Sequence, residues 1–470
     1  MLTNIKSILY DIRIIILFAF VVRLYGITQP PLEIAHNWRQ TTVTMVARNF
    51  AETDFNQLYP RVDFAGYKTG ITGMEFPLLN AGITICIKTF GSNHWYGRLI
   101  NLIVSSLGTW CFFLIIIHYS NYKHAYYSTL IFICSIWFSY SRKIMPDTFA
   151  VSLALMALYC LLMNILNGKL PALLGFLFFT AIALLSKLPS CIVLICVVPM
   201  VYYSKLNPTK KVMLYAIFSI ACLPAVWWYF IWVPHLVKTF GFWHFFMGTT
   251  WQQGFAEIAA NKLLTASRFY DSALKFTGFA LFVWGCICMF YKKHYVSVIA
   301  LVSSLIITLA LVFKAGFTFA HHSYYIIPFV PAMALTAGYG LTSIRQKKLA
   351  IFCLAVVCIE GVLNQYHDFK VKPNEAAVLN LENDLNKIEA KGLIMINSGD
   401  NPTPMYFAHR KGWIAHNYQI ADTSFINQCK TNGLKQLVIL QHAFGTNISV
   451  PYTKLFTNEN YTIYDIASAK

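Results

Sequence analysis

Ionisable residues of two chemical kinds stand in short motifs between the long apolar stretches of this chain. One kind can take a proton from a hydroxyl group. Its candidates are Glu75, His36 and Asp63, and Glu33 ranks below these three. The other kind can hold a phosphate and stabilise charge that develops on it. Its candidates are Arg39, Lys187 and His322, followed by His321, Arg142 and Lys143. We expect Gln40 to support the first group, and Asp147 to orient Arg142 or Lys143.

Several of these residues have a structural alternative. Asp63 lies in a Gly-rich loop and could simply cap a turn. Arg39 could pair locally with Glu75 or Glu33, and Lys187 could extend its ammonium group to a membrane interface without further function. His321 stands near an expected helix start, where a structural histidine is common. The sequence leaves both interpretations open.

The elements that must position these residues are membrane spans. The chain has 470 residues, of which 57% are hydrophobic and only 12% charged, and a span needs about 20 mainly apolar residues. We expect a polytopic α-helical membrane protein with about 11 spans. They lie near residues 10–28, 97–118, 123–141, 146–167, 170–186, 189–204, 211–233, 272–291, 294–313, 324–343 and 348–366.

Charge gives the spans an orientation. With the N-terminus in the cytoplasm, the short inner loops are rich in lysine and arginine, as the positive-inside rule requires. Of the 19 acidic residues, only Asp11 then falls on the inner side. The net charge of +18 is therefore a signal of topology and not of nucleic-acid binding, because no recognised nucleic-acid motif accompanies it. The candidate site faces outward.

Two regions outside the spans are expected to fold. In the long first outer segment, 38–50 and 77–90 are spaced as amphipathic helices, which we expect to lie along the membrane surface. After residue 366 the composition becomes that of a soluble domain, with alternating helical and strand patterns. We therefore expect a transmembrane domain over 1–366 and a small α/β domain over 367–470, outside the cytoplasm.

The order of the polar motifs resembles a known family. The motifs are His36-Asn37-Trp38-Arg39-Gln40, Arg61-Val62-Asp63, Glu75-Phe76-Pro77-Leu78, Arg142-Lys143…Pro146-Asp147, Ser186-Lys187 and Tyr324-Tyr325-Ile326-Ile327-Pro328. Their order and common side resemble the large membrane glycosyltransferases that use polyprenyl-phosphate sugars and share the GT-C fold. This superfamily includes the protein O-mannosyltransferases and the lipid A aminoarabinose transferases. The resemblance covers residues 1 to about 345 and points to a bacterial branch.

The resemblance implies a reaction. A sugar would pass from a polyprenyl-phosphate-linked donor to a hydroxyl group of a protein, lipid or glycan acceptor, on the outer face of the bacterial inner membrane. One displacement at the anomeric carbon would invert its configuration. Better-known members carry an acidic residue, often Asp-Glu, where this chain has His36-Asn37, so the identity of the first-loop base stays open. Some relatives use a divalent metal ion, for which His321, His322 and a loop carboxylate are candidates here.

Two other classes of protein compete with this interpretation. A transporter or flippase of lipid-linked glycans predicts ionisable groups at mid-membrane and helices broken in pairs, whereas the charges here gather at one edge. A polysaccharide ligase or polymerase usually has its long outer loop late in the chain, whereas here the polar cluster follows the first span. Both alternatives explain the charge pattern less well than a transferase.

Overall fold

The computed structural model describes residues 11–242 and 248–469, with side chains described as far as Ile466. It divides the described chain into two compact units. Unit 1 comprises residues 11–27, 98–229 and 248–367, and unit 2 comprises residues 28–97, 230–242 and 368–469. The expected first outer segment (about residues 28–96) therefore shares a unit with the C-terminal segment, a grouping that the linear division into 1–366 and 367–470 does not contain.

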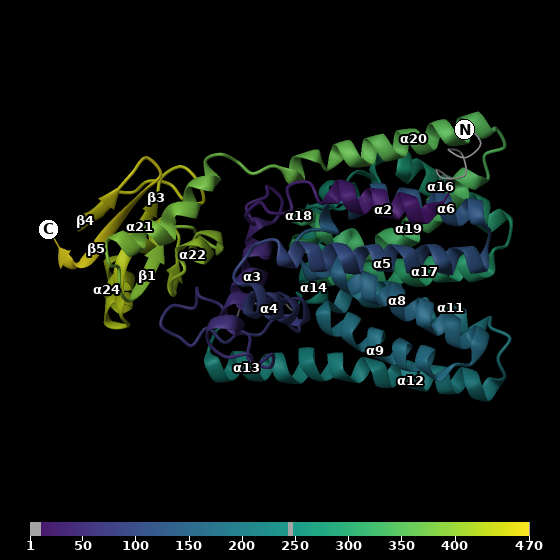
Figure 1. Cartoon of the computed structure of the whole chain (residues 1–470), viewed down its shortest axis with the longest axis horizontal. Coiled ribbons are helices and arrows are strands. Elements are labelled where there is room, and N and C mark those ends of the chain that lie inside the picture. The colour runs from purple at the N-terminus through teal and green to yellow at the C-terminus, as the bar shows by residue number, and fades with distance from the viewer. Residues whose placement is uncertain (1–10, 243–247, 470) are drawn as a thin grey trace. The chain divides into compact units, whose positions relative to one another are not determined.

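Unit 1 is a bundle of helices (Figure 1). Its longer helices are α2 (Ile12–Arg23), α5 (Tyr96–Tyr119), α6 (Tyr122–Cys134), α8 (Pro146–Asn167), α9 (Leu170–Ser186), α12 (Pro208–Trp227), α14 (Trp251–Ala260), α16 (Lys275–Tyr291), α17 (Tyr295–Ala315), α19 (Val330–Thr342) and α20 (Lys347–Asn364). Short helical turns join them: α7 (Trp137–Tyr140), η1 (Leu188–Ser190), α10 (Cys191–Leu194), α11 (Val197–Tyr202), α15 (Lys262–Ser267), η3 (Arg268–Ala273), α18 (Phe317–His321), η4 (Ser323–Phe329) and η5 (Tyr366–Phe369), the last of which reaches into unit 2. The main packed pairs are α8 with α9, α16 with α19 and α6 with α19.

Each expected span coincides with one helix or with a short series of helices, and the first begins one residue before the described part of the chain. The signals for helix ends explain the agreement. Helix α8 has Pro146 in its first turn, where the missing N–H costs nothing, and ends at Gly168 in the left-handed conformation. Pro189 and Pro328 lie in the 3₁₀ turns η1 and η4, so the expected spans 189–204 and 324–343 are not continuous α-helices.

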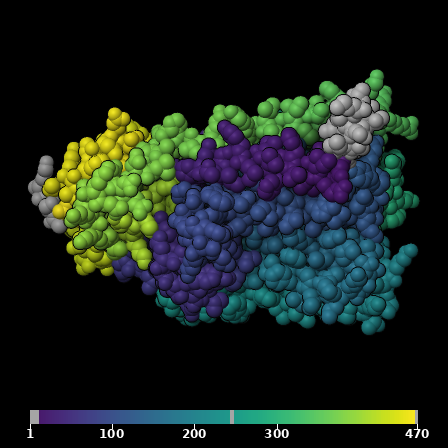
Figure 2. All heavy atoms as spheres, viewed as in Figure 1, coloured from purple at the N-terminus to yellow at the C-terminus, as the bar shows by residue number. Residues whose placement is uncertain are grey.

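The number of spans stays a prediction. Among the described residues, five helices are long and apolar enough to cross a membrane, or six if Lys262–Ala273 and Lys275–Tyr291, which meet at 94°, form one span. Several other expected spans form shorter helices, such as α2 with 12 residues and α6 with 13. Large apolar side chains are exposed along α2 and α20, which form the top edge of the view in Figure 2. Such a surface fits contact with lipid.

Unit 2 contains α3 (Asn37–Glu52), α4 (Leu78–Phe90), α13 (Val233–Phe240) and a five-stranded sheet; the chain passes from unit 1 into unit 2 within η2 (Trp228–Trp232). The strands are β1 (Leu393–Ile396), β2 (Gly412–Ile414), β3 (Leu434–Leu440), β4 (Tyr452–Thr457) and β5 (Tyr461–Ala469). Their order is β2-β1-β3-β5-β4, with β1, β2 and β3 parallel and β5 antiparallel to β3 and β4. The helices are η6 (Glu375–Asn380), α21 (Leu381–Lys387), α22 (Thr403–Ala408), α23 (Asn417–Ala421) and α24 (Thr423–Thr431).

The two faces of this sheet have separate cores. On one face, Ile394 and Val438 pack with Leu381 and Met405, and first-segment residues such as Phe64 belong to the same cluster. The other core contains Met395, Ile426, Leu437, Ile439 and Tyr464. Because strand residues alternate between the two faces, both cores are built from the same strands. The first outer segment thus completes the core of the C-terminal domain.

The expectation that residues 38–50 form a surface helix is wrong in one respect. Helix α3 forms as predicted, but its residues from Arg39 to Phe50 are buried around the whole helix. It packs on α4 and α22, and its polar side chains, such as Arg48 and Asn49, bond to other parts of unit 2. Sequence spacing predicted the helix but could not show that protein covers its polar face.

Candidate active site

A buried ion pair connects the two motifs of the first outer segment. The Nη2 atom of Arg39, in the first turn of α3, lies 2.6 Å from the Oε1 atom of Glu75, just before α4. Arg39 is 9% exposed and Glu75 4%. Burying either charge alone would be costly, so each stabilises the other in this position. The structure therefore brings together a candidate base and a candidate phosphate ligand.

Glu33, Gln40 and His36 surround the start of the same helix. The Nε2 atom of Gln40 donates a hydrogen bond of 3.3 Å to Glu33 Oε2. Glu33 also forms a β-bridge with Val371, which ties this loop to the C-terminal segment. His36 is the residue before α3 and has a left-handed backbone conformation, with φ of 60° and ψ of 42°. A non-glycine residue is uncommon there, and such residues cluster at functional sites.

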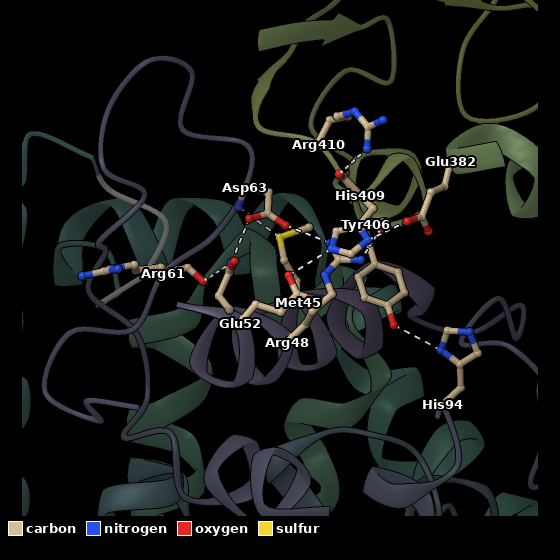
Figure 3. A network of polar contacts seen from close by, with 11 residues as sticks. Met45, Arg48, Glu52, Arg61, Asp63, His94, Glu382, Tyr406, His409 and Arg410 are labelled. Carbon is tan, nitrogen blue, oxygen red and sulfur yellow. Dashed lines mark hydrogen bonds and ion pairs between the residues drawn. The ribbon is translucent and has the colours of Figure 1, made fainter. Parts of the chain in front are cut away.

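Asp63 lies in a different network, along the same helix (Figure 3). Its two carboxylate oxygens accept hydrogen bonds from Arg48 Nη2 at 2.9 Å and from Asn49 Nδ2 at 2.8 Å. The Nη1 atom of Arg48 donates to the carbonyl oxygen of Tyr406 at 2.9 Å, and the Arg48 guanidinium lies over the Tyr406 ring. These contacts lock α3 to α22, so the structure favours the structural alternative for Asp63.

His409, in a recognisable stretch of the C-terminal domain to which the sequence assigned no chemistry, joins three segments of unit 2 (Figure 3). Its Nδ1 atom lies 2.7 Å from Glu382 Oε1, and its Nε2 atom lies 3.0 Å from Glu52 Oε2. Nothing in the local sequence signals this contact, because the three residues are far apart in the chain. The contact fastens the end of α3 to α21 and α22.

A second cluster forms at one end of unit 1. The Nζ atom of Lys187, at the end of α9, lies 3.6 Å from Asp147 Oδ1 in the first turn of α8. The same Nζ atom lies 6.0 Å from the centre of the Tyr324 ring, on which His322 stacks at 5.5 Å. Lys187 and His322 therefore lie against the same tyrosine ring, and Lys187 is an ion-pair partner of Asp147. The expected orientation of Arg142 or Lys143 by Asp147 stays a prediction.

Lys143 belongs to the same end of unit 1. Its Nζ atom lies 5.5 Å from the centre of the Tyr140 ring, and the Tyr140 hydroxyl lies 2.9 Å from Ser323 Oγ, next to His322. The guanidinium of Arg142, in contrast, donates to the carbonyl oxygen of Tyr25. It also donates to the carbonyl oxygen of Gly26, at 3.1 Å. Arg142 thereby satisfies backbone acceptors just beyond the end of α2.

His321 is exposed and faces its own helix. Its Nδ1 atom lies 2.9 Å from the carbonyl oxygen of Phe317, and its ring stacks on the Phe317 ring. Within the described residues, no group of three or more His, Cys, Asp or Glu side chains could hold a metal ion. The residues proposed for a divalent ion, His321 and His322 with a loop carboxylate, therefore do not form such a group, and no step below depends on a metal.

Comparison with known proteins gives this arrangement a context. Residues 75–230 match the family described as dolichyl-phosphate-mannose-protein mannosyltransferase. The crystal structure of ArnT from Cupriavidus metallidurans bound to undecaprenyl phosphate superposes with a TM-score of 0.60, at 10% identity, over 97% of each chain. The chain has the GT-C fold. This is the fold expected from the order of its motifs, with the small C-terminal α/β domain that composition predicted.

Other comparisons agree with the GT-C fold. The apo structure of the same ArnT has a TM-score of 0.61 at 10% identity and covers 99% of this chain and 98% of that one. The apo oligosaccharyltransferase of Archaeoglobus fulgidus has a TM-score of 0.57 at 11% identity, covering 90% of this chain and 69% of that one. No curated protein matches the sequence significantly. At these identities, the structures establish the fold and not the substrates.

Proposed function

We propose that this protein is an integral-membrane glycosyltransferase that moves a sugar from a polyprenyl-phosphate donor to a hydroxyl group of an acceptor. The reaction takes place on the outer face of the bacterial inner membrane. One observation carries the proposal: the fold is shared, over 97% of both chains, with an ArnT that binds undecaprenyl phosphate. The match of residues 75–230 to a mannosyltransferase family supports sugar transfer as the chemistry.

In this proposal, Glu75 is the base that takes the proton of the acceptor hydroxyl. Its carboxylate is held by Arg39 at 2.6 Å, which orients it and compensates its charge in a buried place. Asp63 is a weaker candidate because both of its oxygens already accept hydrogen bonds. His36, in its left-handed conformation beside α3, stays the alternative base.

The cations of unit 1 bind the donor phosphate. Lys187 and His322 are the principal ligands and Lys143 supports them; all three lie at the end of unit 1 where α8 begins and α9 ends. The bond between the anomeric carbon and the phosphate oxygen breaks as the acceptor oxygen attacks. The electron pair leaves with the polyprenyl phosphate, whose growing charge these cations stabilise. A phosphate leaving group needs no general acid, and a single displacement inverts the anomeric carbon.

An apolar cavity in unit 1 suits the isoprenoid chain of such a donor. It has a volume of about 100 Å³ and lies between α5, α8, α17 and α19, with α10 and α11. Its lining includes Phe112, Leu155, Met200, Ala300 and Leu335. Such side chains are as apolar as the lipid that an isoprenoid chain would leave, so the chain can enter without desolvating polar groups. We propose that it receives part of the lipid tail.

The test is donor consumption by the purified full-length protein. The protein is incubated in detergent with a panel of undecaprenyl-phosphate sugars and candidate acceptors, and release of undecaprenyl phosphate is measured. Glu75→Gln should lower the rate by about 10²-fold or more while the protein still folds. Asp54→Asn, an exposed acid of the same segment, is the matched control and should retain the rate.

Two results would overturn the proposal. Wild-type protein that consumes none of the donors, but moves lipid-linked glycans across reconstituted vesicles, would be a flippase. Full transfer by both Glu75→Gln and Arg39→Ala would exclude the assigned base and its partner.

A further inference from the structure

The sheet of unit 2 carries a polar surface at the carboxyl ends of its parallel strands. The strands β1, β2 and β3 are parallel and end at Ile396, Ile414 and Leu440. Because β2 and β3 lie on opposite sides of β1, the connections of the parallel strands diverge at β1. In open α/β sheets, ligands bind outside the carboxyl ends of the strands at such a switch point. We call the residues there, 397–401, 415–418 and 441–446, the carboxyl-edge surface.

A buried asparagine fixes the three loops of this surface to one another. Asn397 donates through Nδ2 to Thr446 O at 2.8 Å, to Asn417 Oδ1 at 3.0 Å and to Leu440 O at 3.2 Å. Its Oδ1 atom accepts from the Leu440 N–H at 2.6 Å. Asn417 in turn donates to Thr446 Oγ1 at 2.7 Å. The loops are therefore held in one arrangement, which lowers the entropic cost of binding a ligand.

Two rings and a carboxylate project from this rigid base. The rings of His416 and Tyr418 stack with centres 5.3 Å apart and planes within 14°, and Tyr418 is 73% exposed. The Nε2 atom of His416 lies 3.5 Å from Oδ2 of Asp400, whose side chain is 98% exposed. Gly399, with φ of +57°, makes room for the His416 ring, because a Cβ atom there would lie 2.9 Å from its Cε1 atom. A flat aromatic face beside hydrogen-bonding groups is the chemistry that binds a sugar ring.

The surface adjoins the segment that carries the proposed base. Thr403, which follows the β1 loop, has its Oγ1 atom 3.1 Å from Thr41 Oγ1 and donates to Asn37 Oδ1 at 3.4 Å. Asn37 and Thr41 belong to the first turns of α3, which also carry Arg39. Through Thr403, the chain that follows the β1 loop is therefore bonded to the helix that carries Arg39, within one compact unit.

Charge indicates the class of ligand. The carboxyl-edge surface contains no lysine or arginine, although the chain has 37 of them, and it does contain the exposed carboxylate of Asp400. An anionic acceptor would be repelled, and an apolar one would find hydroxyl, amide and imidazole groups to desolvate. We infer that this surface binds the acceptor, and that the acceptor is a neutral saccharide. That the bound saccharide is the acceptor rests on the proposed function. That the surface binds a saccharide does not.

Binding can be tested without any donor. Full-length protein in detergent is applied to an array of neutral and acidic oligosaccharides and to a matched peptide array. We expect binding to neutral oligosaccharides, weakened roughly tenfold or more by Tyr418→Ala and within about twofold of wild type in Tyr418→Phe, which keeps the ring. Tyr291→Ala, which removes an 88% exposed tyrosine in unit 1, is the matched control and should bind as wild type does.

Three results would overturn the inference: no oligosaccharide bound by the wild type, preference for peptides or acidic glycans, or equal binding by Tyr418→Ala. The outcome is separable from the proposed reaction. If the protein binds saccharide through Tyr418 but consumes no polyprenyl-phosphate sugar, the proposed saccharide site stands and the proposed transferase activity is rejected. If the protein consumes the donor but binds no saccharide, the transferase activity stands and the saccharide site is rejected.

Discussion

The Arg39 guanidinium and the Glu75 carboxylate form a buried ion pair, with Nη2 of Arg39 2.6 Å from Oε1 of Glu75. The pair joins the first turn of α3 to the residues before α4, and each charge compensates the other in a buried place. In the proposed reaction, a base held in this way has one fixed direction of approach for its substrate hydroxyl.

The geometry of this pair predicts the effect of a charge-conserving change. Arg39→Lys keeps the positive charge but replaces a planar fork with a single ammonium group, which does not hold a carboxylate in one orientation. We expect the transfer rate to fall by roughly 10²-fold, with the folded yield retained. Steady-state rates with the best donor of the panel measure this, and Arg61→Lys in the same segment is the control. Equal rates for Arg39→Lys and wild type would mean that orientation of Glu75 is unimportant.

The Arg48–Asp63 pair predicts a loss of stability instead. Arg48→Met leaves the Asp63 carboxylate buried with one partner fewer, and should lower the free energy of unfolding by about 3–5 kcal/mol. The double variant Arg48→Met/Asp63→Leu removes both charges and should recover most of this loss. Thermal unfolding of the protein in detergent measures both effects. If Asp63→Asn folds normally yet transfers no sugar, Asp63 is the base and the structural assignment fails.

Lys187 and Lys169 stand at opposite ends of α9 and offer a matched comparison. Lys187→Met should weaken binding of undecaprenyl phosphate roughly tenfold, because it removes a cation of the proposed phosphate site. Lys169→Met removes the same charge at the other end of the helix and should leave binding unchanged. Titration of each variant with the lipid phosphate, followed by intrinsic fluorescence, gives the two affinities. Equal weakening by both variants would indicate a general effect of charge.

Asp384 and Tyr461 predict how the stability of unit 2 depends on pH. Burial alone would raise the pKa of Asp384, but hydrogen bonds from Lys387 and Tyr461 outweigh it and lower that pKa. Burial, together with the hydrogen bond to Asp384, raises the pKa of Tyr461. The contribution of Asp384 is thus complete above its ordinary pKa of about 3.9 and is lost as the pH falls below it. That of Tyr461 is complete below about pH 10 and is lost at higher pH.

Tyr461→Phe separates these two effects. The variant leaves Asp384 without the hydroxyl that donates to it at 2.7 Å, and should cost about 1–3 kcal/mol at neutral pH. It should also remove part of the destabilisation above pH 10, because no phenol remains to ionise at this position. Melting temperatures between pH 3 and pH 11 test both statements, with Tyr464→Phe on the same strand as the control. An unchanged alkaline limb would assign that destabilisation to other groups, such as Tyr406, whose pKa burial raises to about 12.

Local signals determined how well the sequence predicted each element. Helix α8 could be predicted to the residue, because Pro146 and Gly168 mark its ends. Strands β2 and β4 were not predicted, because three residues (Gly412–Ile414) are too few to show alternation and β4 is mostly exposed. The motifs that carry Arg39, Glu75, Lys187 and His322 were recognisable because each is a short run of polar residues beside an apolar stretch.

Pairing between distant residues could not be predicted. Periodicity indicates which face of a helix is apolar, but not which segment will cover its polar groups, as Arg48 and Asn49 of α3 illustrate. Asp63 was a candidate base because nothing in the sequence shows that Arg48 and Asn49 donate hydrogen bonds to its carboxylate. The same holds for His409, whose two carboxylate partners come from separate segments of the chain.

The sharing of one core by residues 28–97 and 368–469 has a consequence for biogenesis. A ribosome makes the first of these segments early, whereas the strands that share a core with Phe50, Val62 and Phe64 are made last. Throughout the synthesis of the intervening helices, those apolar side chains have emerged without their final neighbours. Residues 28–97 can therefore complete their core only after translation has passed through β5, so a nascent chain that stalls earlier would leave these apolar side chains exposed to chaperones.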